Sequence, residues 1–218
     1  MPKKCLILGG ETLSWRLVHK VQQYQPKCQI FNHYGPTETT VGVCTFAISP
    51  ETNISASATV PLGKPLVNTQ IYLLDRSLQP VPIGVPGELY IGGKNLARGY
   101  FNQPELTAEK FIKFQSHLKA SEQRLYKTGD KARYLEDGNL EFLGRIDRQV
   151  KIRGYRIELG QIESTLQQHP SIKDAVVTVT VDKCDRKRLV AYIVKDQQQR
   201  LTDEDLQNFL SQKFYQTI

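Results

Sequence analysis

The chain lacks several features that would place it at once in a membrane or secreted class. Its 218 residues contain no apolar run long enough to span a bilayer, no signal peptide and no internal repeat. Neither a membrane-spanning nor an exported protein is therefore expected. These missing signals lead us to expect a cytoplasmic protein without a membrane partner.

Cysteine is also scarce and is not placed as in a metal site. The four cysteines stand at positions 5, 28, 44 and 184, far from the close pairs that bind zinc. Free thiols in a reducing compartment are expected instead of disulfides.

Charge of one sign is in moderate excess. There are 29 Lys and Arg against 22 Asp and Glu, a net charge of +7, with 39% hydrophobic and 23% charged residues. The basic residues are scattered, except for a dense cluster at 183–188. A small phosphate ligand therefore fits at least as well as DNA, and no nucleic-acid partner is expected. The composition is that of a globular chain.

The first thirty residues have the pattern of a βαβ unit. An apolar run at 5–8 ends in Gly9-Gly10, helical spacing follows at 12–25, and a second strand is predicted at 27–31. One such unit cannot cover both faces of a parallel sheet. We therefore expect the unit to be the end of a longer α/β subdomain, cut from a longer chain.

A polar loop, predicted at residues 32–40, follows the second strand. It offers an aromatic ring, a glycine, hydroxyl groups and the carboxylate of Glu38. In open α/β sheets ligands bind beyond the carboxyl ends of strands, so this segment is a candidate ligand site. The alternative is a simple Gly-Pro turn with a threonine cap.

The middle of the chain has short β-type runs separated by glycines and prolines. The runs lie at 70–74, 87–91, 133–135 and 140–143, with a short helix at 105–111 and a hairpin turn at 136–139. This pattern predicts a small antiparallel sheet or distorted barrel. Within it, Asp130 could bind a ribose diol, or the Thr-Gly-Asp sequence could be only a turn.

Residues 144–154 form a charged junction that ends in a glycine turn at Gly154. Residues 150–153 alternate apolar and charged side chains, as in a half-buried strand. The simpler interpretation is a charged edge strand. Its position between two different compositions favours a domain boundary that can swivel.

Beyond the junction the pattern is α+β. A helix is predicted at 159–168, strands at 172–181 and 189–194 with a polar loop at 183–188, and a last helix capped by Thr202. The predicted organisation is thus 1–58, the end of a parallel α/β part; 59–146, a distorted antiparallel β-barrel; and 147–218, a small, mobile and incomplete α+β subdomain.

Four ordered motifs resemble the amino-acid adenylation domains of nonribosomal peptide synthetases, within the adenylate-forming superfamily. They are NHYGPTE at 32–38, GELYIGGKNLARGY at 87–100, YKTGD at 126–130 and GRIDRQVKIRGYRIELGQIE at 144–163. The resemblance covers nearly the whole chain and corresponds to the C-terminal part of such a domain. Two positions depart from the family pattern, Asn95 for a glycine and Lys127 for an arginine.

The resemblance implies a role for each matched residue. Asn32 would bind the adenine edge, Tyr34 would stack on adenine, and Gly35 belongs to the same nucleotide loop. Thr37 would contact the α-phosphate and Glu38 would hold Mg²⁺. The remaining implied residues are Asp130 for the ribose hydroxyls, Arg145 for ribose or phosphate, and Asp147 as the hinge of the small subdomain.

The resemblance also implies an activity. The full domain would be an ATP-dependent ligase that makes aminoacyl-AMP and passes the aminoacyl group to the phosphopantetheine of a carrier domain, beside other synthetase modules of natural-product biosynthesis. The family's phosphate loop and ammonium-binding aspartate would precede Met1, and its catalytic lysine would follow Ile218. Because losing one such group commonly costs a factor of about 100–1000, this chain alone is expected to be a poor or inactive enzyme.

Part of the family's amino-acid pocket falls in the chain. By resemblance the pocket residues are Ile7, Gly9, His33, Val41 and Gly42. This set resembles aspartate-selecting domains, and an imidazole among small residues would suit a short acidic side chain. The alternative is that His33 only packs beneath the loop.

Two other functions stay open from the sequence. One is an acyl-CoA or aryl-acid ligase of the same superfamily, although the proline of YGPTE and the QVKIRG string favour the peptide-synthetase branch. The other is a non-catalytic split or remnant module that binds a nucleotide or a partner chain.

Overall fold

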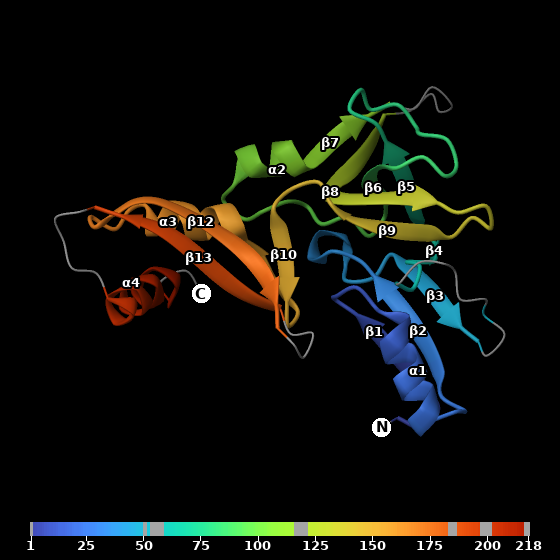
Figure 1. Ribbon diagram of the computed structural model, residues 1–218. Helices are drawn as coiled ribbons and strands as arrows, with labels where there is room; N and C mark the ends of the chain where they lie inside the picture. Colours follow the sequence, from blue (N-terminus) through green and yellow to red (C-terminus); the bar gives the residue numbers. More distant parts are fainter. Residues whose placement is uncertain are drawn as a thin grey trace. The chain divides into compact units, whose positions relative to one another are not determined.

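The computed structural model describes residues 2–49, 52, 59–115, 122–182, 187–196 and 202–215, with side chains in the last range described to 213. The chain divides into two compact units, Met1–Asp147 and Arg148–Ile218 (Figure 1).

The first unit begins with a small sheet that carries one helix. Its elements are β1 (Cys5–Gly9), α1 (Trp15–Tyr24), β2 (Gln29–Tyr34), the 3₁₀ turn η1 (Thr37–Thr39), β3 (Cys44–Ile48) and β4 (Lys64–Pro65), and the strand order is β1-β2-β3-β4. β1 pairs parallel to β2 with Ile7 opposite Phe31, and the later pairs are antiparallel. The predicted βαβ unit is confirmed.

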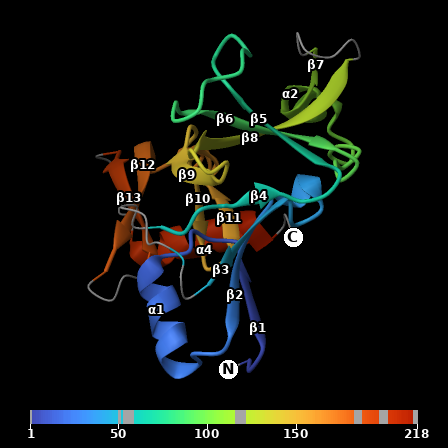
Figure 2. The same cartoon turned by 90° about the vertical axis from the view of Figure 1, so that its right-hand side faces the viewer.

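Helix α1 forms because its apolar residues recur at helical spacing behind a capping serine. The hydroxyl of Ser14 accepts a hydrogen bond from the backbone N–H of Leu17 at 3.3 Å. The helix runs alongside β1 and β2 (Figure 2) and packs on one face of the sheet, where the buried core is Leu13, Trp15, Val18, Val21, Ile30, Ile48 and Val60. Residues 5, 7 and 9 of β1 are exposed.

The prediction that a loop begins at residue 32 is wrong. β2 continues to Tyr34, because Asn32, His33 and Tyr34 pair with Phe46, Thr45 and Cys44 of β3. The sequence pattern does not predict β3, so these residues had no expected partner strand. The site loop therefore begins at Gly35.

A second sheet of five antiparallel strands completes the first unit. Its elements are β5 (Thr69–Leu74), β6 (Gly87–Gly93), α2 (Pro104–Lys110), β7 (Phe111–Phe114), β8 (Gln123–Tyr134) and β9 (Leu140–Arg145). The order is β5-β6-β8-β7, with β9 also paired to β8. The predicted antiparallel sheet is confirmed, but no closed barrel forms among the described residues, since no pairing there joins the edge strand β5 to β7 or β9.

Strand β8 holds this sheet together. Its first residues pair with β7, its last residues pair with β9, and β6 lies along its other side. The Thr-Gly-Asp sequence lies inside β8 and is not an isolated turn. The predicted hairpin turn after β8 is confirmed, because the Leu135 N–H donates to the Asn139 carbonyl at 2.8 Å.

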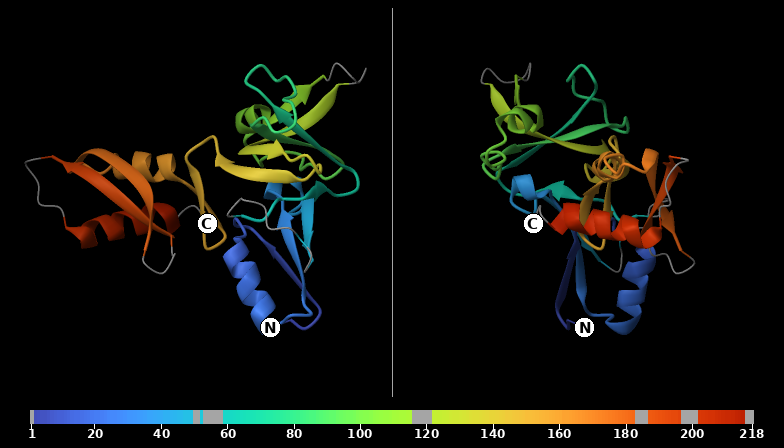
Figure 3. Two further views of the ribbon diagram at one scale, coloured as in Figure 1. Left: turned by 45° about the vertical axis from the view of Figure 1, so that its right-hand side comes forward. Right: turned by 90° about the vertical axis from the view of Figure 1, so that its left-hand side faces the viewer.

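The second unit is an α+β arrangement. Its elements are β10 (Gln149–Ile152), β11 (Tyr155–Glu158), α3 (Leu159–Leu166), β12 (Ile172–Val181), β13 (Lys187–Lys195) and α4 (Asp203–Tyr215). β10 and β11 form one antiparallel pair, and β12 and β13 form another. Leu159 and Leu166 of α3 and Leu206 and Leu210 of α4 share one core with β12. Figure 3 draws both helices beside the β12–β13 strand pair.

The glycine turn of the junction is a two-residue hairpin loop. Arg153 has φ +53° and Gly154 has φ +81°, and both lie between the paired residues Ile152 and Tyr155. Positive φ at both central residues is the geometry that matches the twist of a hairpin. The predicted polar loop at 183–188 is partly wrong, because Lys187 and Arg188 already belong to β13, and 183–186 lie outside the described residues.

The cysteine expectation agrees with the structure where the residues are described. Cys5, Cys28 and Cys44 are free thiols, as expected, and Cys184 lies outside the described residues. In the part of the chain that the structure describes, no helix is long and apolar enough to cross a membrane.

We predict that Leu140→Ala lowers the free energy of unfolding by about 2–5 kcal/mol, because this fully buried side chain fills the core shared by the two sheets of the first unit. Urea unfolding measures the change. Leu143→Ala in the same strand is the control, since Leu143 is 38% exposed and should lose far less. Equal losses in the two variants would contradict this view of the core.

Candidate nucleotide site

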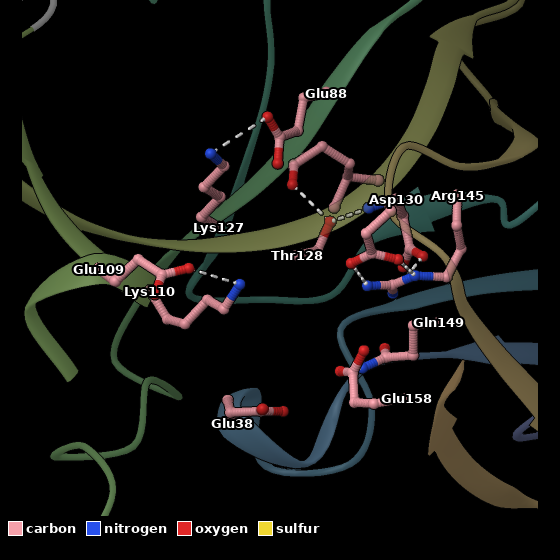
Figure 4. Close-up of polar contacts among 12 residues, drawn as sticks. Glu38, Glu88, Glu109, Lys110, Lys127, Thr128, Asp130, Arg145, Gln149 and Glu158 are labelled. Atoms are coloured by element: carbon pink, nitrogen blue, oxygen red, sulfur yellow. Dashed lines mark hydrogen bonds and ion pairs between the residues drawn. The ribbon is translucent and has the colours of Figure 1, made fainter. Parts of the chain in front are cut away.

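Three segments that are far apart in the sequence meet at the carboxylate of Asp130. The hydroxyl of Tyr34, at the end of β2, donates to Asp130 Oδ2. The guanidinium of Arg145, at the end of β9, donates from Nη1 to Asp130 Oδ1 at 2.8 Å (Figure 4). Both carboxylate oxygens of Asp130 thus have a partner from another motif.

Local pairing explains why these side chains meet. Asp130 and Arg145 stand opposite each other in the β8–β9 ladder. The backbone N–H of Asp130 also donates to the Thr128 hydroxyl at 2.9 Å, and that hydroxyl donates to the Leu89 carbonyl at 2.6 Å. Asp130 is therefore fixed from its backbone and from its side chain.

Arg145 binds a second carboxylate two residues along the chain. Its Nε donates to Asp147 Oδ1 at 2.6 Å, and its Nη2 donates to Asp147 Oδ2 at 2.5 Å. This bidentate pair is the geometry in which arginine and carboxylate interact most strongly. The Asp147 side chain is 37% exposed, whereas that of Arg145 is 13% exposed.

Glu38 lies in η1 and is held from a distant segment. The hydroxyl of Tyr100 donates to Glu38 Oε1 at 2.6 Å, and the Ala97 N–H donates to the Glu38 carbonyl at 2.8 Å. Glu38 is buried, and these two hydrogen bonds hold it in a defined position. Figure 4 draws its side chain on η1. Tyr100 closes the GELYIGGKNLARGY run, yet no role was expected for it from the sequence.

Asn95, where the family pattern has glycine, stabilises the same turn. Its side-chain amide donates to the Thr39 carbonyl at 3.3 Å, and its backbone carbonyl accepts from the Thr40 hydroxyl at 2.8 Å. Asn95, although the family pattern has glycine here, therefore stabilises the turn that carries Glu38.

Asn32 in β2 and Thr37 in η1 differ in their burial and in their hydrogen bonds. Asn32 is buried, and its amide nitrogen donates to the carbonyls of Val60 at 3.3 Å and Pro61 at 2.8 Å. This nitrogen is engaged by the backbone, and Oδ1 is the atom that could still accept a hydrogen bond from a ligand. Thr37 is exposed, and no described residue hydrogen-bonds its hydroxyl.

Gly35 and Gly42 allow a close approach of the loop to β2. A Cβ on Gly35 would lie 2.5 Å from the Val41 carbonyl oxygen, and a Cβ on Gly42 would lie 1.8 Å from His33 Nε2. Gly35 therefore has no space for a side chain beside the backbone, and a side chain at Gly42 would have to displace the His33 ring. The imidazole of His33 lies directly against Gly42.

The structure brings together most of the predicted pocket residues. Gly9 pairs with His33, and Ile7 stands two residues before Gly9 on the same exposed side of β1. A Cβ on Gly9 would lie 2.5 Å from the His33 carbonyl oxygen. Val41 is 72% exposed and has φ +70°, next to Gly42. Ile7, Gly9, His33 and Gly42 thus form one surface, which Val41 borders.

Burial affects the titration of two tyrosines in the site. Burial raises the pKa of Tyr34 well above its ordinary value, and the negative charge of Asp130 and the hydrogen bond to it raise it further. Burial also raises the pKa of Tyr100, and its hydrogen bond to Glu38 adds to the effect. Both hydroxyls therefore stay protonated and remain donors at neutral pH.

A magnesium ion would have one carboxylate here. Among the described residues no group of three or more His, Cys, Asp or Glu side chains is gathered as for a metal ion. Magnesium is commonly bound through one or two carboxylates together with substrate phosphates and water. The single carboxylate of Glu38 fits that mode.

Comparison with known proteins gives consistent matches. A model of the AMP-binding enzyme family matches residues 3–101. Tyrocidine synthase 2 of Brevibacillus parabrevis is 50% identical over 211 residues, which are 96% of this chain and 6% of that protein. The malpinin synthetase of Mortierella alpina is 50% identical over 191 residues, which are 87% of this chain and 2% of that protein. The chain therefore spans a small part of the relatives it matches.

Solved structures give the same result. A fused adenylation and PCP di-domain from Klebsiella oxytoca, NpsA-ThdA, is 34% identical with a TM-score of 0.79, covering 95% of this chain and 37% of that one. The four-domain nonribosomal peptide synthetase AB3403, bound to AMP and glycine, is 44% identical with a TM-score of 0.57, covering 94% of this chain and 15% of that one.

We predict that Gly42→Ala displaces the His33 imidazole, because the new methyl group would occupy its place. The His33 ring signals in NMR spectra should shift, and the free energy of unfolding should fall by about 1–3 kcal/mol. Gly160→Ala is the control, since a Cβ there meets nothing within 4 Å. Unchanged His33 signals in Gly42→Ala would refute the packing described here.

We also predict a loss of stability at alkaline pH. Since the folded-state pKa values of Tyr34 and Tyr100 are raised, the free energy of unfolding should be constant below the ordinary tyrosine pKa of about 10 and fall as the pH rises above it. Tyr100→Phe should reduce this fall, measured by urea unfolding from about pH 8 to about pH 11. Tyr24→Phe, at an exposed position, is the control; an equal change in both variants would contradict the assignment.

Proposed function

Since the chain belongs to the adenylation domains of nonribosomal peptide synthetases, we propose that it supplies the nucleotide-binding half of an amino-acid activating site. In the proposed reaction, a carboxylate oxygen of an amino acid bonds to the α-phosphorus of ATP. The bond from that phosphorus to the pyrophosphate oxygen breaks. Aminoacyl-AMP and pyrophosphate result. A phosphopantetheine thiol of a carrier domain then attacks the acyl carbon, the acyl–phosphate bond breaks, and AMP leaves as the aminoacyl thioester forms.

The observation that carries this proposal is the meeting of Tyr34, Asp130 and Arg145. An aromatic ring, a carboxylate with two oxygens and a guanidinium are the groups that a nucleoside monophosphate needs for base, ribose and phosphate. They come from three of the four motifs, and two ladders of paired strands hold them. AMP bound to the related four-domain synthetase is consistent with such a ligand.

Each group of the nucleotide has a proposed partner. Tyr34 stacks on adenine, Asn32 accepts from its exocyclic amine through Oδ1, and Gly35 lets the loop approach the base. Asp130 accepts from the ribose hydroxyls. Thr37 donates a hydrogen bond to the α-phosphate and Arg145 neutralises charge there, where preorganised donors contribute most to the rate.

Glu38 would hold Mg²⁺ together with the phosphates of ATP. The ion would neutralise phosphate charge, which is its usual contribution in such sites. Tyr100 would hold one oxygen of this carboxylate in a fixed orientation. Tyr100 is on this account a positioning residue.

The pocket surface of β1 and β2 suits a short acidic amino acid. The His33 imidazole lies against Gly42, and Gly9 faces the His33 backbone carbonyl, so neither neighbour adds a side chain to this surface. A donor at this place would pair with a side-chain carboxylate. We therefore propose aspartate as the substrate, with Ile7 and Val41 as the apolar borders of the pocket.

Partners and domain motion follow from the same proposal. A carrier domain and further synthetase modules would receive the aminoacyl group, in keeping with the adenylation and PCP di-domain among the similar structures. The units Met1–Asp147 and Arg148–Ile218 would move about Asp147 between the two half-reactions. The isolated 218 residues would be inactive or nearly so without the other groups of the full domain.

The test is pyrophosphate exchange in the full-length domain that contains this chain. We predict that His33→Ala lowers aspartate-dependent exchange at least about tenfold, because the partner of the substrate carboxylate is lost, while ATP binding changes little. His19→Ala, at an exposed position in α1, is the control.

Each outcome has a separate meaning. Unchanged exchange with aspartate in His33→Ala would remove the aspartate assignment. Exchange that depends on an aryl acid, or on an acyl acid followed by thioester formation with CoA, would favour the other ligases of the superfamily. No exchange with any carboxylic acid would refute the activity.

A further inference from the structure

Asp147 shares its arginine with the ribose-binding carboxylate. One guanidinium, that of Arg145, donates to Asp130 from Nη1 at 2.8 Å and to Asp147 from Nε at 2.6 Å and Nη2 at 2.5 Å. We call the Arg145–Asp147 pair the fork. The Asp130 and Arg145 side chains are 8% and 13% exposed, so solvent screens this charge group only partly.

The Thr-Gly-Asp sequence is built around the fork. A Cβ on Gly129 would lie 2.6 Å from Asp147 Oδ2 and 2.7 Å from Arg145 Nη2. The Ile146 N–H donates to the Gly129 carbonyl at 2.8 Å, and Gly129 has φ +74°. Gly129 thus leaves the space into which the fork fits, and its carbonyl fixes the residue between the fork's two members.

The charge balance of this group depends on Asp147. With the fork closed, two carboxylates face one guanidinium, so the carboxylate of Asp147 reduces the positive potential of Arg145 beside the place proposed for the phosphate. Without Asp147, the Asp130–Arg145 pair is neutral, and more of the arginine's positive potential reaches an anionic ligand. A neutral nucleoside would be affected much less.

We propose that Asp147 is a positioning residue that sets, through Arg145, the affinity of the site for the phosphate of the nucleotide. A closed fork disfavours the anionic ligand, and an open fork favours it. This inference rests on the proposed nucleotide site. It gives Asp147 an electrostatic role in addition to its proposed role as a hinge.

The first measurement tests the fork without a nucleotide. In the NMR spectrum of the full-length domain, the Arg145 Nε–H should be protected from exchange with water, and Asp147→Asn should reduce that protection. Gly129→Ala should reduce it too, whereas Gly84→Ala, with φ +82° and no atom within 4 Å of its Cβ, should not. Rapid exchange of the Arg145 Nε–H in the wild type would overturn the inference.

The second measurement compares AMP with adenosine by calorimetry. Asp147→Asn should raise the ratio of AMP affinity to adenosine affinity by about 5-fold or more, the lower range of typical coupling between sites. The gain should shrink at high salt. Glu136→Gln, in the exposed turn at the other end of the β8–β9 pair, removes the same charge and should leave the ratio unchanged.

The results separate this inference from the proposed function. If wild type and Asp147→Asn bind both ligands with the same ratio, the role of Asp147 is refuted and the nucleotide site stands. If neither protein binds AMP or adenosine, the proposed nucleotide site is refuted and this inference falls with it. If Glu136→Gln changes the ratio as much as Asp147→Asn, net charge and not the fork is responsible, and the inference is refuted.

Discussion

The first unit depends on one buried carboxylate with donors from two other segments. Asp130 accepts from Tyr34, 96 residues earlier, and from Arg145, 15 residues later. A carboxylate that is 8% exposed needs such donors, because burying it without them would be costly. The end of β2, the middle of β8 and the end of β9 are therefore fixed relative to one another by the same atoms that the nucleotide would use.

This arrangement makes stability and the proposed function depend on the same residues. Tyr34 is held protonated by its burial beside Asp130, and Tyr100 is held protonated by burial beside Glu38, since burial raises both pKa values. Both hydroxyls are donors to carboxylates with a proposed role in binding the nucleotide or its metal ion. The site is thus preorganised by hydrogen bonds inside the protein.

Glycines complete the site by leaving space. Gly42 makes room for the His33 imidazole, and Gly129 makes room for the Arg145–Asp147 fork. In both places a methyl group would overlap a polar side chain of the site. The departures from the family pattern, Asn95 and Lys127, leave these contacts intact, and Asn95 adds hydrogen bonds to the turn that carries Glu38.

The sequence by itself determined the local elements and the family. Apolar spacing predicted β1, α1, β12 and α4, because these signals are read within one segment, and four ordered motifs identified the adenylation domains. It did not predict β3 or the continuation of β2 into Asn32, and it allowed a barrel where the described strands leave the sheet open. Only the tertiary structure decided that Tyr100 binds Glu38 and that Arg145 joins Asp130 to Asp147. Those contacts depend on strand register and on side chains from distant segments, which no local pattern encodes.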